Sequence, residues 1–132
     1  LENNDLKILI LGYKKFRRGE YLYKKESNMI DLNILWLKQL LYPIMVNNSF
    51  KCISFDNLAI KQLDVKNSLN MSDEEWDMFY MGDDGGFTMY IDAVNYKYAK
   101  NSCMSEDERF DMNGKTVQEM FKHIQDLYGK NE

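Results

Sequence analysis

The side chains of this chain that could do chemistry are concentrated in residues 72–92, a mixture of carboxylates and large aromatic rings that we call the acidic run. Between Lys66 and Lys97 the sequence has no lysine or arginine, and its acidic residues there are Asp73, Glu74, Glu75, Asp77, Asp83, Asp84 and Asp92. Carboxylates at the rim of an interface attract a basic partner and raise its association rate, while exposed Tyr and Trp supply contact area. The acidic run therefore predicts a surface that binds a basic protein.

Whether the aromatic rings are exposed or buried distinguishes this prediction from a simpler alternative. In that alternative the acidic run is a solvated helix face, whose acids help capping and solubility while its rings enter the core. The rings are numerous, however, and they cannot all easily be buried beside so many charges: Trp76, Phe79, Tyr80, Phe87 and Tyr90. We therefore expect these residues to contact the partner: Asp73, Glu74, Trp76, Asp77, Tyr80, Asp83, Asp84 and Tyr90.

Residues 13–25, the basic arm, carry the opposite charge. The arm interleaves rings with Lys14, Lys15, Arg17, Arg18, Lys24 and Lys25, against the single acid Glu20. Cations can pair with phosphates while rings such as Tyr21 and Tyr23 stack on bases, so a nucleic-acid-binding or regulatory module is the alternative function. The arm is short, has no known RNA-binding signature and belongs to a protein of net charge −4, so nucleic acid is not the favoured partner. The arm could also lie against the acidic run of the same molecule.

Catalytic chemistry has little support. His123 is the only histidine, so His–His metal pairs are excluded and acid–base schemes are limited. Cys52 or Cys103 would be a nucleophile only if the fold brought it to His123. The aspartates of the acidic run do not have EF-hand spacing, and its glycines are not followed by the Lys of a phosphate loop. We predict no catalytic residue, no cofactor and no metal; an enzyme with a carboxylate site is a second alternative.

The composition predicts a folded, cytoplasmic domain. Of the 132 residues, 45% are hydrophobic and 14% aromatic, which is too much apolar surface for a disordered chain. No repeat or proline-rich linker divides the sequence, so residues 1–132 are expected to form a single domain. Both cysteines are expected to be reduced. No apolar run approaches the roughly 20 residues of a membrane span, so no membrane association is expected.

The first half of the chain is predicted to alternate strand pairs with one helix. Residues 6–11 are apolar and typical of a buried strand, and residues 20–25 alternate as the second strand of a hairpin. Helical spacing over residues 29–42 predicts a helix capped by Ser27 or Asn28 and ended by Pro43. Residues 50–55 and 58–65 are predicted as strands around a turn at 56–57, with a helix beginning at Asp56 as the rival interpretation.

The second half follows the same scheme. Ser72 and Glu75 have the spacing of a capping box and predict a helix that ends before Gly82. Residues 83–86 predict a turn, 87–99 a long strand, 109–112 a short strand, 113–114 a turn and 115–128 an amphipathic helix. Strand pairs between helices predict an α+β domain, with a largely antiparallel sheet of about four to six strands and about three helices packed on it.

These observations favour a small acidic protein-binding module that inhibits a basic partner. Bacterial immunity proteins, which neutralise nuclease toxins, are acidic single domains that work by this physics. The analogy is with that class of toxin inhibitor or antitoxin as a whole, since no motif here resembles a particular immunity family. The sequence leaves the oligomeric state open.

Overall fold

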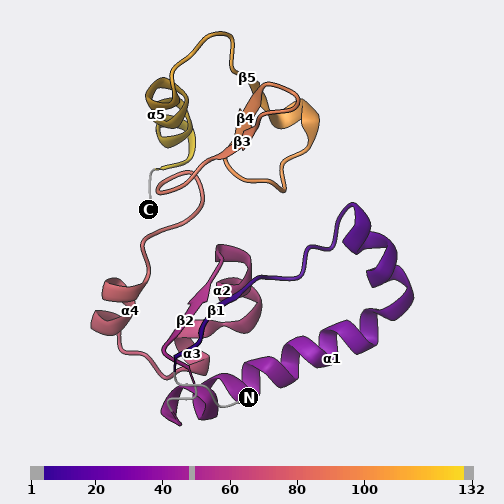
Figure 1. Ribbon diagram of the computed structural model, residues 1–132, viewed down its shortest axis with the longest axis vertical. Coiled ribbons are helices and arrows are strands. Elements are labelled where there is room, and N and C mark those ends of the chain that lie inside the picture. Colours follow the sequence, from indigo (N-terminus) through magenta and orange to yellow (C-terminus); the bar gives the residue numbers. More distant parts are fainter. Residues whose placement is uncertain (1–4, 48–49, 130–132) are drawn as a thin grey trace. The chain divides into compact units, whose positions relative to one another are not determined.

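The computed structural model describes residues 5–47 and 50–129, and the chain divides into two compact units, Leu1–Phe79 and Tyr80–Glu132 (Figure 1). The first unit contains β1 (Lys7–Ile10), α1 (Arg18–Val46), β2 (Cys52–Phe55), α2 (Asn57–Leu63), α3 (Val65–Ser68) and α4 (Asp73–Phe79). The second contains β3 (Tyr90–Asp92), β4 (Lys97–Ala99), a 3-10 turn (Glu106–Glu108), β5 (Phe110–Asp111) and α5 (Val117–Tyr128).

The mixture of helices and strands confirms the coarse fold prediction, but the arrangement differs from the predicted one. In the described residues there are five α-helices and two small sheets of two and three strands, instead of one sheet of four to six strands with three helices. Each unit has its own core: Leu41, Ala59, Leu63 and Val65 in the first, and Tyr98, Met120 and Ile124 in the second. That the whole chain acts as a single domain stays a prediction.

The sheet of the first unit is parallel. β1 and β2 pair in the register Lys7–Cys52 to Ile10–Phe55. Parallel strands need a long crossover between them, and α1 supplies it. The strands predicted at residues 6–11 and 50–55 are therefore present, but β1 is not buried as expected, and the antiparallel expectation is wrong for this sheet. One face of β1 remains open, since Leu9 is 60% exposed.

The basic arm is not a hairpin. Its second half is the first turns of α1, where Glu20 and Lys24 form an i,i+4 ion pair with an Oε1–Nζ distance of 2.6 Å. The prediction of a strand at residues 20–25 was wrong because alternation of rings and charges also suits a helix lying largely in solvent. α1 then kinks at Glu26, whose φ and ψ of −128° and 28° are not helical. The predicted cap at Ser27 lies beside this kink.

α1 also continues through Pro43 to Val46, so the predicted stop at proline was wrong. Proline removes one backbone donor from the helix, but it leaves its own carbonyl free to accept. The N–H of Asn47 donates to that carbonyl at 3.1 Å and closes the last turn. The face containing Ile30, Ile34, Leu37 and Leu41 packs as predicted, with Ile30 and Leu41 buried.

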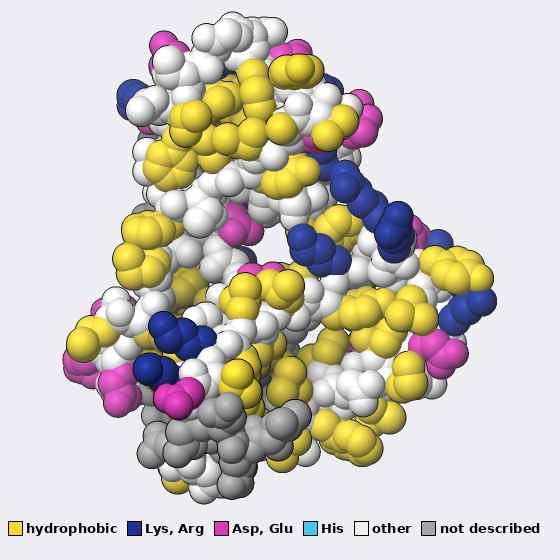
Figure 2. Space-filling view, in the orientation of Figure 1, with side chains coloured by type: hydrophobic (Ala, Val, Ile, Leu, Met, Phe, Trp, Pro, Cys, Tyr) yellow, Lys and Arg dark blue, Asp and Glu magenta, His cyan; other side chains and the backbone are white. Residues whose placement is uncertain are grey.

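The rest of α1 has an apolar surface. Figure 2 shows hydrophobic side chains over this helix, and Trp36 is 61% and Leu40 52% exposed. Among the described residues, α1 is the one helix that is long and apolar enough to cross a membrane by length and composition, although no apolar run of that length was expected. The core helices of soluble proteins and signal sequences have the same length and composition.

After β2 the chain turns into helix rather than into a second strand. Asp56 caps α2 by accepting a hydrogen bond from the Ala59 N–H at 2.7 Å, and it also accepts one from the Gly12 N–H at 2.9 Å. The rival prediction of a helix from Asp56 is therefore confirmed, and the strand at residues 58–65 was wrong. A capping aspartate satisfies donors that a hairpin turn would leave open.

In the second unit β3, β4 and β5 form an antiparallel sheet in that order. The predicted long strand at residues 87–99 was wrong, because Asp92 accepts hydrogen bonds from the N–H groups of Val94 and Asn95 and turns the chain back. The short strand near residue 110, the turn at 113–114 and the helix that follows it are confirmed. α5 begins at a capping box between Thr116 and Glu119 and buries Met120 and Ile124 on the sheet.

Candidate functional site

The first part of the acidic run forms α4, and the predicted capping box is present. The Ser72 N–H donates to Glu75 Oε2 at 2.8 Å, and the Glu75 N–H donates to Ser72 Oγ at 3.2 Å. Asp73, Glu74 and Asp77 are all exposed, and Figure 2 shows acidic side chains gathered over this helix. A hydrogen bond from Lys66 lowers the pKa of Asp73, and hydrogen bonds from its own N–H and from Ser72 lower the pKa of Glu74. These two carboxylates are therefore charged at neutral pH.

Trp76 is a half-buried member of α4. Its ring packs against Phe79 at a centroid distance of 5.6 Å, and Phe79 meets Phe55 of β2 edge-on at 6.3 Å. The Nζ of Lys66 lies 6.0 Å from the Trp76 ring centroid. Trp76 thus serves the core of the first unit while part of its ring stays accessible beside the exposed carboxylates.

Met78, on the same helix, is 85% exposed. The sequence analysis did not name Met78 as a surface residue, because it considered only the charged and aromatic side chains of this stretch. Its neighbours Trp76 and Phe79 lie on the packed face of α4, so the spacing of the rings alone could have placed Met78 on the other side.

The second part of the acidic run belongs to the second unit, where hydrogen bonds within that unit hold its carboxylates. The Tyr80 hydroxyl donates to Asp83 at 2.8 Å, and the Asn101 amide donates to Asp84 at 3.1 Å. Burial raises the pKa of Tyr80 to about 12, with help from the hydrogen bond to Asp83. All four residues are half-buried. These contacts stabilise the turn that starts the unit.

Asp92 and Tyr90 meet a cation that the sequence analysis did not consider. Arg109 Nη1 donates to Asp92 Oδ2 at 2.7 Å, its Nε donates to the Met104 carbonyl at 3.2 Å, and its guanidinium lies 5.1 Å from the Tyr90 ring centroid. The Arg109 side chain is only 1% exposed. Hydrogen bonds from Asn95 lower the pKa of Asp92, and the charge of Arg109 lowers it further. This end of the acidic run is a buried ion pair between β3 and the residue that precedes β5.

The structure therefore divides the eight predicted contact residues between the two units. Asp73, Glu74, Trp76 and Asp77 belong to the first, and Tyr80, Asp83, Asp84 and Tyr90 belong to the second. A single patch that contains all eight stays a prediction. Of these eight residues, the exposed carboxylates that lie together in one unit are those of Asp73, Glu74 and Asp77 on α4.

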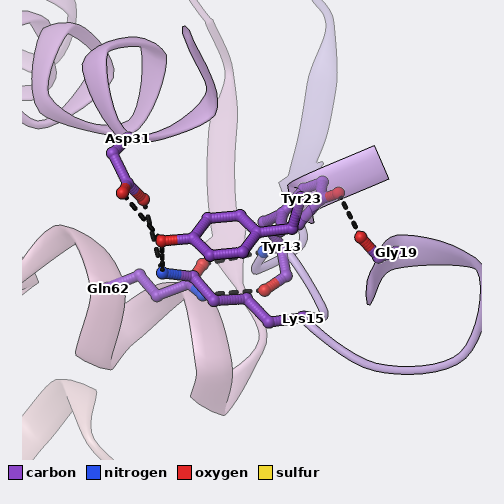
Figure 3. Close-up of polar contacts among 6 residues, drawn as sticks. All are labelled: Tyr13, Lys15, Gly19, Tyr23, Asp31 and Gln62. Carbon is purple, nitrogen blue, oxygen red and sulfur yellow. Dashed lines mark hydrogen bonds and ion pairs between the residues drawn. The ribbon is translucent and has the colours of Figure 1, made fainter. Parts of the chain in front are cut away.

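The basic arm is tied to the first unit by a polar network (Figure 3). Lys15 Nζ donates to the Tyr23 hydroxyl at 2.7 Å and pairs with Asp31 at 3.3 Å, while the Tyr23 hydroxyl donates to Asp31 at 2.8 Å. The hydrogen bond with Tyr23 raises the pKa of Lys15 and lowers that of Asp31. Lys15 also lies 4.0 Å from the Tyr23 ring centroid, so it covers one face of that ring.

A second set of bonds holds the start of the arm. The Tyr13 N–H donates to Gln62 Oε1 at 2.7 Å, and Gln62 Nε2 returns a bond to the Tyr13 carbonyl at 2.8 Å. The Tyr13 hydroxyl donates to the Gly19 carbonyl at 2.8 Å (Figure 3). The first half of the arm is thus the connection between β1 and α1, and hydrogen bonds with Gln62 hold it on α2. That it also lies against the acidic run stays a prediction.

His123 lies on the face of α5 that packs against Tyr98 and Phe110. Its Nδ1 is 2.7 Å from the Tyr98 hydroxyl, and its ring meets Phe110 edge-on at 4.6 Å. Lys115 Nζ donates to the same hydroxyl at 3.2 Å. Because Tyr98 is fully buried, this hydroxyl is not accessible to a substrate. No group of three or more His, Cys, Asp or Glu side chains in the described residues could hold a metal ion.

One groove lies beside α4. It has a volume of about 450 Å³ and is lined by the last turns of α1, by the segment between α3 and α4, and by α4 itself: Tyr42, Met45, Val46, Leu69, Asn70, Met71 and Glu75. All of these residues belong to the first unit. Sequence reasoning missed the groove because it ended α1 at Pro43, before Met45 and Val46.

Comparisons with protein-family models, with curated protein sequences and with solved structures found no significant match. The geometry of the chain itself is therefore the basis for any functional proposal. In that geometry, α4 and the groove beside it combine exposed carboxylates with apolar side chains, whereas the hydrogen-bonded carboxylates of the second unit contribute to its own stability.

Proposed function

We propose that this chain is a small protein-binding module, not an enzyme, that inhibits a basic partner in the manner of an immunity protein acting on a nuclease toxin in the cytoplasm. One observation supports the proposal best: α4 presents Asp73, Glu74 and Asp77 to solvent next to the half-buried ring of Trp76. This is the combination of rim charge and aromatic anchor that protein interfaces use.

The charges of α4 suit long-range attraction. The lowered pKa values of Asp73 and Glu74 keep both carboxylates ionised well below neutral pH. Lys66 pairs with Asp73. An exposed pair of this kind contributes little to stability, so the partner can replace it at small cost. The remaining negative field would raise the encounter rate with a basic surface.

The test begins with a basic protein that co-purifies with the chain from its native host and is then produced in pure form. Its association rate is measured against the wild type and against a variant with Asp73→Asn and Asp77→Asn. We expect the variant to associate several-fold more slowly at about 20 mM salt and at nearly the wild-type rate at about 500 mM. The wild-type chain should also inhibit the activity of that partner.

A matched control removes two exposed carboxylates of the second unit, through Glu106→Gln and Asp126→Asn. These changes alter the net charge equally but leave α4 intact, so a smaller effect is expected. Co-purifying proteins that are all acidic, or association that does not depend on salt, would contradict the proposal. Trp76→Ala should instead speed dissociation, because it removes contact area rather than charge.

The basic arm offers less to a nucleic acid than its composition suggests. Lys15 covers one face of Tyr23, and Lys25 lies 4.4 Å from the ring centroid of Tyr21. Rings covered by the chain's own cations are poorer stacking platforms for bases. A gel-shift assay with single-stranded RNA and DNA at low salt tests this alternative: retardation at micromolar protein would favour it over the inhibitor.

The carboxylate enzyme is less favoured for a similar reason. His123 contacts two rings, Tyr98 and Phe110, and shares the buried hydroxyl of Tyr98 with Lys115. A histidine whose ring is packed this way has little freedom to carry protons to a substrate. If His123→Gln abolished an activity of the chain without unfolding it, the enzyme interpretation would regain support.

A further inference from the structure

The groove beside α4 has apolar walls and a charged edge. Met45 and Val46 of α1 are 42% and 58% exposed, so a ligand can reach both. Leu69 and Met71 line it from the segment before α4. Methionine side chains are flexible and polarisable, which lets a surface adapt to apolar groups of different shape. The walls therefore suit aliphatic or aromatic side chains rather than a polar ligand.

Local structure holds the groove in place. Asn70 has a φ of 54°, and the Met71 N–H donates to the Lys66 carbonyl at 3.0 Å, which turns the chain from α3 toward α4. The capping bond from the Ser72 N–H then fixes the Glu75 carboxylate among the lining residues. The groove is therefore bordered on one side by the helix that carries the exposed carboxylates.

The charge of this border determines the chemistry of the occupant. Glu75 is the one charged residue among the described residues of the lining, and Asp73 and Glu74 precede it on the same helix. Resting on the proposed function, we infer that the groove takes the apolar side chains of an amphipathic basic helix of the partner, whose lysines and arginines then meet the carboxylates of α4. This is the helix-in-groove mode of recognition, in which apolar anchors recur every three or four residues.

Charge complementarity argues against a second copy as the occupant. In a two-fold dimer the same patch of both copies is brought together. Here that contact would place the acids of one α4 against those of the other, and like charges across an interface are costly. A basic helix carries the charge opposite to that of α4, so its docking replaces this repulsion by attraction. A dimer formed through the groove is accordingly an outcome that would overturn the inference.

The probe is a synthetic helical peptide of about 16 residues, made of leucine on one face and lysine on the other. One control has the same composition in an order that scatters the leucines, and a second replaces lysine by glutamate. The full chain carries ¹³C-labelled methionine methyl groups, and variants Met45→Leu and Met71→Leu assign the two signals from the groove. We expect the first peptide to shift both signals and the two controls to bind at least tenfold more weakly.

Val46→Lys places a cation in the groove at a position that is 58% exposed, so the chain should still fold. We expect it to weaken peptide binding about tenfold, because it removes an apolar wall and repels the lysines. The matched control is Val94→Lys in the second unit, a change at an 84% exposed valine that should leave binding unchanged. Glu75→Gln, which keeps a side chain able to cap, should weaken binding less, with the difference lost at high salt.

The outcomes separate this inference from the proposed function. Equal binding to the wild type and to Val46→Lys, binding of all three peptides alike, or no binding of the leucine–lysine peptide would overturn the groove as the docking site. The proposed function would survive each of these results, because it depends on salt-dependent association with the full partner through the carboxylates of α4. If association with the partner did not depend on salt, but Val46→Lys still weakened peptide binding, the groove would stand as the docking site and the proposed function would be overturned.

Discussion

The two parts of the acidic run have similar compositions but different physical roles. In α4 the carboxylates of Asp73, Glu74 and Asp77 are exposed. In the second unit Asp83 is held by Tyr80, and Asp92 is held by Arg109 and Asn95. These half-buried and buried carboxylates have less surface to offer a partner than the exposed carboxylates of α4.

This difference shows that charge in a sequence has two uses that composition cannot separate. Exposed acids contribute little to folding but set the field that a partner experiences. Buried or half-buried acids are held by specific donors, and removing one of those donors is costly. The comparison therefore predicts that changes in the second part of the run affect stability, while changes in α4 mainly affect binding.

The largest expected effect is at the buried end of the run. Arg109→Leu should lower the free energy of unfolding of the second unit by about 3 kcal/mol, because it removes a guanidinium that fills a buried site and leaves its partner unpaired. Urea unfolding followed by the methionine methyl signals of that unit measures the change. Replacing both Arg109 and Asp92 by leucine should recover much of the loss.

The matched change in the first part is Lys66→Met, which removes the partner of the exposed Asp73. It should leave the unfolding midpoint of the first unit almost unchanged. A loss at Lys66 as large as that at Arg109 would break the distinction between the two parts of the acidic run.

A smaller loss is expected at the turn that opens the second unit. Gly85 has a φ of 90°, and a Cβ there would lie 2.8 Å from the Cβ of Tyr128. Gly85→Ala should therefore cost about 2 kcal/mol, from backbone strain and from displacement of α5. At Gly86 the nearest atom to an added Cβ is 3.5 Å away, so Gly86→Ala is the control and should have little effect. Thermal unfolding of the two variants compares them directly.

The capping box of α4 should have a still smaller effect. Ser72→Ala removes the acceptor for the Glu75 N–H and should destabilise this short helix by about 1 kcal/mol. Hydrogen exchange of the α4 amides measures the change. Thr116→Ala, which removes the corresponding cap of α5, is the counterpart in the second unit. Unchanged exchange in α4 would show that packing of Trp76, rather than capping, holds the helix.

The smallest effect appears only at alkaline pH. The pKa of Tyr80 is raised to about 12 from an ordinary value of 10.0, so the folded unit favours the neutral phenol. The stabilisation from this raised pKa is fully present below pH 10 and is lost as the pH rises toward 12. The ultraviolet absorbance of tyrosinate is measured against pH for the wild type and for Tyr80→Phe. The difference between the two curves should be a titration centred near pH 12. A midpoint near 10 would show that neither burial nor the hydrogen bond to Asp83 acts on Tyr80.

Some of the fold could be predicted from the sequence because the interactions involved are local. Ser72 and Glu75 are three residues apart, so their capping box needs no information from the rest of the chain. The predicted turn at residues 83–86 depends on glycine at a positive φ, and Gly85 has one. The periodic face of α1, with Ile30 and Leu41 buried, was likewise visible as helical spacing.

The failures involve local patterns that fit more than one structure. Residues 20–25 alternate like a strand, yet they form the first turns of α1, where Glu20 and Lys24 pair at i,i+4. Residues 58–65 suit a strand by composition, but Asp56 provides a helix cap that also binds the Gly12 N–H, 44 residues away. Pro43 weakens a helix, but the carbonyl it retains accepts the bond that closes the final turn.

The candidate site shows the same limit. The sequence located the charge and the rings of the acidic run, and α4 carries part of them at the surface. It did not show that Asp92 would find Arg109, which stands 17 residues further along the chain. It also did not show the groove, whose walls come from α1 and from the segment before α4.

The sequence by itself determined the signs and positions of the charges, the capping box of Ser72 and Glu75 and the turns at residues 83–86 and 113–114, because each depends on residues within a few positions of one another. The tertiary structure alone decided that β1 and β2 pair in parallel, that the acidic run is divided between two units, and which of its carboxylates remain exposed. The physical reason is that a carboxylate becomes structural or available according to the donors that folding brings within hydrogen-bond distance, and for Asp84 and Asp92 one such donor lies 17 residues further along the chain.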